Sequence, residues 1–129
     1  MHKTSSVIRS FVRRQGRVTK GQRTAIKNYW SVYGIEVTDK PLDLQKAFTD
    51  VQPIVLDIGF GDGEALVSIA QQFPHLNFLG VEVYQPGIGS LLRKIVKLEL
   101  NNIRIVNIDA VNLLQEHIVI LLQIQMDVY

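Results

Sequence analysis

Short apolar runs alternate with amphipathic stretches along the second half of the chain. The run from Pro53 to Ile58 is nearly continuous and predicts a strand that is buried on both faces. Two further runs, at 77–83 and 103–108, predict the next two strands. Between the strands, apolar residues recur at helical spacing over 66–73 and 88–98. This alternation predicts a Rossmann-like α/β fold, with parallel strands joined by right-handed crossover helices.

The ends of these helices are marked by proline. Pro74 is expected to end the first helix, and Pro86 is expected to lie in the first turn of the second. A short helix is predicted over 110–117. The tail at 118–129 is rich in β-branched residues and is compatible with a fourth strand.

The first half of the chain contains one helical pattern, which is predicted to begin at Thr24 and to end at Gly34. Its apolar stripe consists of Ile26, Tyr29, Trp30 and Tyr33. We interpret this stripe as a packing surface. Residues 35–52 predict a connector with one or two helical turns. The chain is therefore expected to have three segments: a basic arm over 1–23, a helix and connector over 24–52, and half of a sheet domain over 53–129.

Charge is distributed unevenly along the chain. Residues 1–35 contain eight Lys or Arg residues and no acidic residue, whereas the other 94 residues contain six basic and twelve acidic ones. Cations in such an arm suit a nucleic-acid backbone, although a solvated tail has the same composition. The candidate phosphate contacts are Arg9, Arg13, Arg14, Arg17 and Lys20.

Composition excludes several other classes of protein. There is no cysteine, so disulfides and thiolate metal sites are excluded, and the three histidines are too scattered to predict a metal site. The N-terminus lacks the apolar region of a secretory signal. The longest apolar stretch is far shorter than the roughly 20 residues that span a bilayer. We expect a cytoplasmic protein with no membrane partner.

A glycine-rich loop, Gly59 to Gly63, follows the first strand of the sheet and precedes a helix. Nucleotide ligands bind at this edge of such sheets, and glycines there take positive φ and let the backbone approach a ligand. The sequence has Glu64 where the dinucleotide fingerprint has its third glycine. Acids at Asp57, Asp62 and Glu64 disfavour a pyrophosphate. They suit S-adenosylmethionine, which carries a sulfonium and an ammonium group, better than NAD.

Two further acids follow the next strands. Glu82 lies where an acid accepts hydrogen bonds from ribose hydroxyls, and Asp109 lies where one can accept from an adenine amino group. Each acid is also compatible with an ordinary surface position, and the glycine loop with a tight turn. Asp62 is better explained as a helix cap. The predicted cofactor-binding residues are Asp57, Gly59, Gly61, Gly63, Glu82 and Asp109.

Several segments together resemble one family, the bacterial tRNA (guanine-N(7)-)-methyltransferases. The similar segments are 9–17, 19–22, 29–30, 57–63, 77–83, 86–89, 101–104 and 109–110. The resemblance implies the class I methyltransferase sheet and methyl transfer from S-adenosylmethionine to N(7) of a guanine in tRNA. It also implies that Asp57, where the family usually has Glu, contacts the cofactor together with Glu82 and Asp109.

The resemblance covers about residues 8–117, and the sequence departs from this family from Val119 onward. The Pro-Asp-Pro-Trp segment of the family, which carries its catalytic-site Asp, does not occur, so no catalytic residue is assigned. We therefore expect a truncated, N-terminal part of such an enzyme with weak or absent activity. The alternatives are a non-catalytic fragment that binds tRNA or cofactor, and a sheet that a second chain completes.

Overall fold

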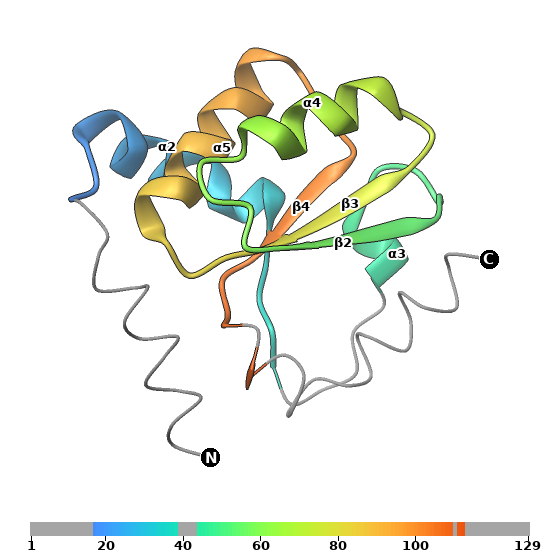
Figure 1. Cartoon of the computed structure of the whole chain (residues 1–129), viewed down its shortest axis with the longest axis horizontal. Helices are drawn as coiled ribbons and strands as arrows, with labels where there is room; N and C mark the ends of the chain where they lie inside the picture. The colour runs from blue at the N-terminus through green and yellow to red at the C-terminus, as the bar shows by residue number, and fades with distance from the viewer. Residues whose placement is uncertain (1–16, 39–43, 110, 113–129) are drawn as a thin grey trace.

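The computed structural model describes residues 17–38, 44–109 and 111–112, which form a parallel sheet covered by helices (Figure 1). The elements in chain order are α2 (Lys20–Tyr33), β1 (Gly34–Ile35), α3 (Leu44–Ala47), β2 (Ile54–Ile58), α4 (Glu64–Gln72), β3 (Asn77–Val81), α5 (Gln85–Lys97) and β4 (Ile103–Val106). The four strands lie in the order β1-β4-β3-β2, and every neighbouring pair is parallel. The predicted class of fold is confirmed.

The helices cover both faces of the sheet. α2, α4 and α5 lie on one face, and the short α3 lies on the other (Figure 1). The larger core packs Leu66 of α4 and Leu92 of α5 against the first face. The smaller core packs Leu44 and Phe48 against Leu79 on the second face. As a result, all five residues of β3 are buried, and the strand that leads to Glu82 has a fixed position.

α2 begins at Lys20, about one turn before the predicted start at Thr24. Thr19 and Gln22 form a capping box. The Thr19 hydroxyl accepts from the Gln22 N–H at 3.1 Å, and the Gln22 side-chain oxygen accepts from the Thr19 N–H at 2.9 Å. Residues 20–23, which composition had placed in the arm, are therefore helical.

β1 is a strand that the hydrophobic pattern does not predict. Gly34 ends α2 as expected, but Gly34 and Ile35 then pair with Ile105 and Val106 of β4. Glycine is required at this turn, because a Cβ on Gly34 would lie 2.3 Å from the Trp30 ring. A strand of two residues is too short for period-two alternation to be visible in a sequence.

The prediction that β2 is buried on both faces is wrong. Within the described part of the chain, β2 pairs only with β3 and forms an edge of the sheet. Val55 and Ile58 are accordingly 36% and 46% exposed. Leu98 was assigned to the apolar face of α5, but it follows the helix and is 40% exposed.

The other element boundaries agree closely with the predictions. α4 ends at Gln72, shortly before Pro74, and Pro86 lies in the first turn of α5. β3 and β4 each end two residues earlier than predicted, so Glu82 follows its strand in a loop. Residues 111–112 are helical, and the rest of the helix predicted over 110–117 lies outside the described residues, as does the tail at 118–129.

Asn102 connects the end of α4 to the start of β4. It is 3% exposed, and its Nδ2 donates to the carbonyl oxygens of Ala70, Phe73 and Leu76 at 3.1, 3.3 and 3.0 Å. The last carbonyls of a helix have no partner within the helix, so they need donors from outside it. One amide group therefore fixes the turn between α4 and β3 against the next strand.

We predict that Asn102→Ala lowers the free energy of unfolding by about 2 kcal/mol, because it leaves buried carbonyls without a donor. Asn101→Ala changes the exposed neighbouring position and is the matched control, with an expected effect of about 0.5 kcal/mol or less. Urea unfolding followed by circular dichroism measures both values. Equal stability of the two variants would contradict the role assigned to Asn102.

Candidate functional site

The loop between β2 and α4 contains three glycines in the left-handed region. Gly59, Gly61 and Gly63 have φ values of 74°, 64° and 84°, which residues with a Cβ rarely adopt. The expected positive φ is therefore confirmed at all three positions. A Cβ added at Gly59 or Gly61 would meet no atom within 4 Å. The backbone at these two glycines thus has an open side that a ligand can approach.

The other side of the loop rests on the first turns of α5. A Cβ at Gly87 would lie 1.9 Å from the carbonyl oxygen of Gly61, and a Cβ at Gly63 would lie 2.7 Å from Leu91 Cδ1. Sequence reasoning assigned no role to Gly87. The available signal was a glycine directly after a proline in a helix, where glycine lowers helix stability unless a close contact requires it.

Glu82 ties the loop to the end of β3. Its Oε1 accepts a hydrogen bond from the Gly61 N–H at 2.8 Å. Its Oε2 accepts from the N–H groups of Val83 and Tyr84, each at 3.1 Å. Hydrogen bonds to an ionised carboxylate are stronger than neutral ones. Glu82 therefore holds the glycine loop and the segment that enters α5 in one arrangement.

Asp57 lies beside Glu82 at the end of the neighbouring strand. Its register partner in β3 is Gly80, two residues before Glu82. Burial, followed by repulsion from Glu82, raises the pKa of the Asp57 carboxyl above its ordinary value of 3.8. The structure thus brings two of the predicted acids close enough to repel each other, and a positively charged group beside them would relieve this repulsion.

Two other acids make local contacts with the backbone. Asp109 follows β4, and its Oδ1 accepts from the Asn112 N–H at 2.7 Å, which caps the helical residues 111–112. Asp62 Oδ1 accepts from the N–H of Glu64, the first residue of α4, at 3.1 Å. The interpretation of Asp62 as the helix cap is wrong, because Gly63 is the N-cap of α4 and no side chain caps this helix; Asp62 precedes the cap and closes a local turn. Asp109 is at the same edge of the sheet as Glu82, because the carboxyl ends of parallel strands meet there.

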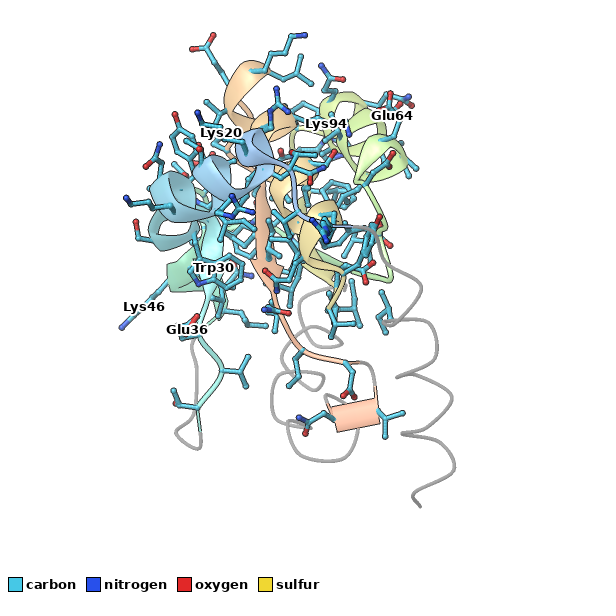
Figure 2. The ribbon with its side chains drawn as sticks, turned by 90° about the vertical axis from the view of Figure 1, so that its left-hand side faces the viewer. Lys20, Trp30, Glu36, Lys46, Glu64 and Lys94 are labelled. Atoms are coloured by element: carbon cyan, nitrogen blue, oxygen red, sulfur yellow. The ribbon has the colours of Figure 1, made fainter. Side chains whose placement is uncertain are left out.

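Lys94 is a further contact of the loop that sequence reasoning missed. Its Nζ donates to the carbonyl oxygen of Asp62 at 3.0 Å and to Ser90 Oγ at 2.8 Å. It also lies 3.6 Å from Glu64 Oε2 (Figure 2). Only the tertiary fold brings Lys94 to Asp62, 32 residues away in sequence, so no local pattern could have revealed this contact.

The predicted tRNA-binding residues are described only in part. Arg9, Arg13 and Arg14 lie outside the described residues. Arg17 is exposed in the segment before α2, and Lys20 is exposed at the first residue of that helix. Of these two, Lys20 is the first residue of α2 and so belongs to the folded body of the chain.

A hollow of about 490 Å³ lies between α2, β1, the start of α5 and the end of β4. Trp30 lines it, and the Trp30 Nε1 donates to Glu36 Oε2 at 2.9 Å (Figure 2). The amide side chains of Gln85, Asn107 and Asn112 also line it. None of the predicted cofactor-binding residues lines it. Gln85 and Asn107 nevertheless follow the ends of β3 and β4, so the hollow opens at the same carboxyl edge of the sheet as Glu82 and Asp109.

Two kinds of feature are absent from the described part of the chain. Its His, Asp and Glu residues form no group of three or more that could hold a metal ion. In the same residues, no helix is long and apolar enough to cross a membrane.

A protein-family model described as "Putative methyltransferase" matches residues 51–125, a span that includes β2, the glycine loop, β3 and β4. The chain belongs to this methyltransferase family. The match contains the whole edge at which Asp57, Glu82 and the glycine loop meet.

Curated relatives in bacteria are similar over most of the chain. A tRNA (guanine-N(7)-)-methyltransferase of Edwardsiella ictaluri (strain 93-146) is 50% identical over 111 residues, which cover 86% of this chain and 47% of the relative. Proteins of the same name in Yersinia enterocolitica and Pectobacterium atrosepticum are 50% and 48% identical over 111 residues, each covering 86% of this chain and 46% of the relative. The chain thus spans about half the length of the curated relatives it matches.

A solved structure titled "Structure of an antibiotic related Methyltransferase" is also similar. It is 17% identical, with a TM-score of 0.48, and the match covers 73% of this chain and 43% of that one.

We predict that Asp57→Asn stabilises the fold at neutral pH. Because the folded-state pKa of Asp57 is raised, its ionised form opposes folding; below its ordinary value of 3.8 it is protonated in both states and this effect disappears. The melting temperature of the variant should therefore exceed that of the unmodified chain at neutral pH and converge with it in acid.

Asp50→Asn, the same change at an exposed position, is the control and should leave the melting temperature unchanged. Scanning calorimetry across this pH range makes the comparison. A lower melting temperature of Asp57→Asn at neutral pH would contradict the assignment.

Proposed function

We propose that this chain forms the S-adenosylmethionine-binding part of a tRNA (guanine-N(7)-)-methyltransferase. The observation that carries the proposal is the identity of 50% over 111 residues to curated relatives of that name. The carboxyl edge of the sheet supports the proposal independently, because a ligand there would meet negative charge and open space beside the glycine loop.

The charges at this edge suit S-adenosylmethionine better than a dinucleotide. Asp57 and Glu82 already repel each other, and a pyrophosphate would add further negative charge beside them. A ligand with a sulfonium and an ammonium group would instead be attracted. The open side of Gly59 and Gly61 provides space for backbone contact with it.

In this proposal, Glu82 binds the ribose hydroxyls and Asp109 accepts from the adenine amino group. Three backbone N–H groups already use the Glu82 carboxylate. An ionised carboxylate has about four acceptor sites. A ribose hydroxyl would therefore share the carboxylate with the Gly61 N–H or replace that hydrogen bond. Cofactor binding and the position of the glycine loop would thus be coupled through one side chain.

Bound S-adenosylmethionine supplies the methyl group that is transferred. Guanine N(7) carries a nucleophilic lone pair without deprotonation, so the protein contributes mainly by positioning the tRNA and the cofactor. We assign the tRNA backbone to the cations Arg9, Arg13, Arg14, Arg17 and Lys20, because phosphate contacts set orientation without requiring a particular sequence.

We predict that Glu82→Gln weakens S-adenosylmethionine binding about tenfold or more. The variant removes the charge and replaces one acceptor oxygen by a donor that faces backbone N–H groups. Glu64→Gln neutralises an acid that is mostly exposed in the first turn of α4, and should change the affinity about twofold or less. Calorimetric titration of both variants measures the difference.

The same titration with NAD tests the other class of ligand. Tighter binding of NAD than of S-adenosylmethionine would contradict the cofactor assignment. The reaction is tested by incubating the chain with unmodified tRNA and S-adenosylmethionine that carries a tritiated methyl group. Label at guanine N(7) would support the full proposal, and label in a different nucleoside would contradict the assigned position. Cofactor binding without label would restrict the function of this chain to binding.

A further inference from the structure

The outer surfaces of α2 and α5 are positively charged. Together, the two helices carry six Lys or Arg residues and no Asp or Glu. The six cations are Lys20, Arg23 and Lys27 on α2, and Arg93, Lys94 and Lys97 on α5. The other described cations are Arg17, Lys46 and Arg104, so most of the described positive charge lies on these two helices.

Helical geometry directs these side chains outward. Lys20, Arg23 and Lys27 follow one another at the spacing of a single helix face, whereas Ala25 on the opposite face is buried. All three cations are exposed. On α5, Arg93 and Lys97 are also exposed, while the buried face is formed by Leu91, Leu92 and Ile95. Each helix therefore presents one row of cations to its surroundings.

The two rows lie beside each other. A Cβ added at Gly21 of α2 would lie 3.0 Å from the Arg93 guanidinium, so the small residue leaves space for Arg93 to contact α2. A groove of about 560 Å³ between the helices is lined by Tyr29, Ser90, Arg93, Lys94, Val96 and Lys97. Figure 2 faces this side of the molecule and shows Lys20 of α2 and Lys94 of α5.

Few of these charges are neutralised within the fold. Among the described residues, Lys94 is the one member of the six within 4.0 Å of a carboxylate, that of Glu64. Arg23 donates to the Val18 carbonyl oxygen at 3.3 Å, which does not neutralise it. Positive charges placed close together repel one another, and a bound anion would reduce this repulsion.

We propose that α2 and α5 form a docking surface for the phosphate backbone of an RNA, which we call the basic face. Its members are Lys20, Arg23, Lys27, Arg93 and Lys97. The inference rests on the proposed tRNA function and extends it from the N-terminal arm to the folded body, where only Lys20 was a predicted contact. Tyr29 in the groove adds an aromatic ring that can contact a ribose or base.

An RNA fits this surface better than an anionic membrane does. Helices that bind at a membrane interface place large apolar side chains beside their cations. On α2 and α5, Val32 is the one large apolar residue that is exposed among those described. A row of phosphates needs only cations, and its affinity falls with salt in proportion to the number of contacts.

Single charge removals on each helix test the basic face. Lys27→Gln and Lys97→Gln remove one cation from α2 and α5, and the double variant removes both. Lys46→Gln is the matched control, since Lys46 is an exposed lysine at the end of α3 on the other face of the sheet. Fluorescence anisotropy with labelled tRNA, and with an RNA duplex of unrelated sequence, gives the affinity at several salt concentrations.

We expect each single variant to weaken binding of both RNAs severalfold and to reduce the slope of log affinity against log salt by about 0.7–1. The double variant should lose about twice as much slope, and Lys46→Gln should match the unmodified chain. Circular dichroism spectra of all four proteins show whether the fold is retained. An unchanged slope in the double variant would overturn the inference. A chain that binds neither RNA would also overturn it. The same holds if the double variant binds both RNAs normally and loses affinity only for vesicles with anionic headgroups, measured in parallel.

These results are separable from those that test the proposed function. Duplex RNA binding that depends on the basic face, without S-adenosylmethionine binding, would support the docking surface and contradict the proposed function. The opposite result is cofactor binding together with a slope of log RNA affinity against log salt that no variant changes. It would support the proposed function and overturn the docking surface.

Discussion

The hydrogen bonds from Gly61, Val83 and Tyr84 to the Glu82 carboxylate connect the two loops that form the carboxyl edge of the sheet. Glu82 can serve this purpose because it follows β3, a strand that is buried along its entire length. The contact of Gly61 with Gly87 closes the same arrangement from the side of α5. These contacts hold the glycine loop in one position with its open side toward the solvent, as a binding site requires.

Charge divides the described molecule into two regions of opposite sign. Asp57 and Glu82 form an acidic edge that suits a ligand carrying positive charge. The basic face on α2 and α5 suits the negative backbone of a nucleic acid. In the proposed function, a cationic methyl donor binds the acidic edge and an RNA binds the basic face. The uneven charge along the sequence therefore corresponds to a separation of charge in space.

Periodicity predicted the order of strands and helices, because each buried element repeats its pattern over several residues. It did not predict β1, which has two residues, or the exposure of β2, which depends on how many neighbours a strand has. The start of α2 was recoverable from Thr19 and Gln22, a capping pattern that the apolar stripe does not include. The contact of Lys94 with the glycine loop was beyond sequence reasoning, since it joins segments far apart in the chain. Gly87 left one signal, a glycine inside a helix, but the sequence does not show what it contacts.

The central claim is that the edge held by Glu82 binds S-adenosylmethionine. Amide NMR spectra recorded during a titration with the cofactor test it most directly. The account predicts the largest shifts at Gly59, Gly61, Val83 and Tyr84, with the Lys46 amide unchanged on the opposite face of the sheet. A titration that leaves the amides of Gly59, Gly61, Val83 and Tyr84 unshifted at millimolar cofactor would contradict it.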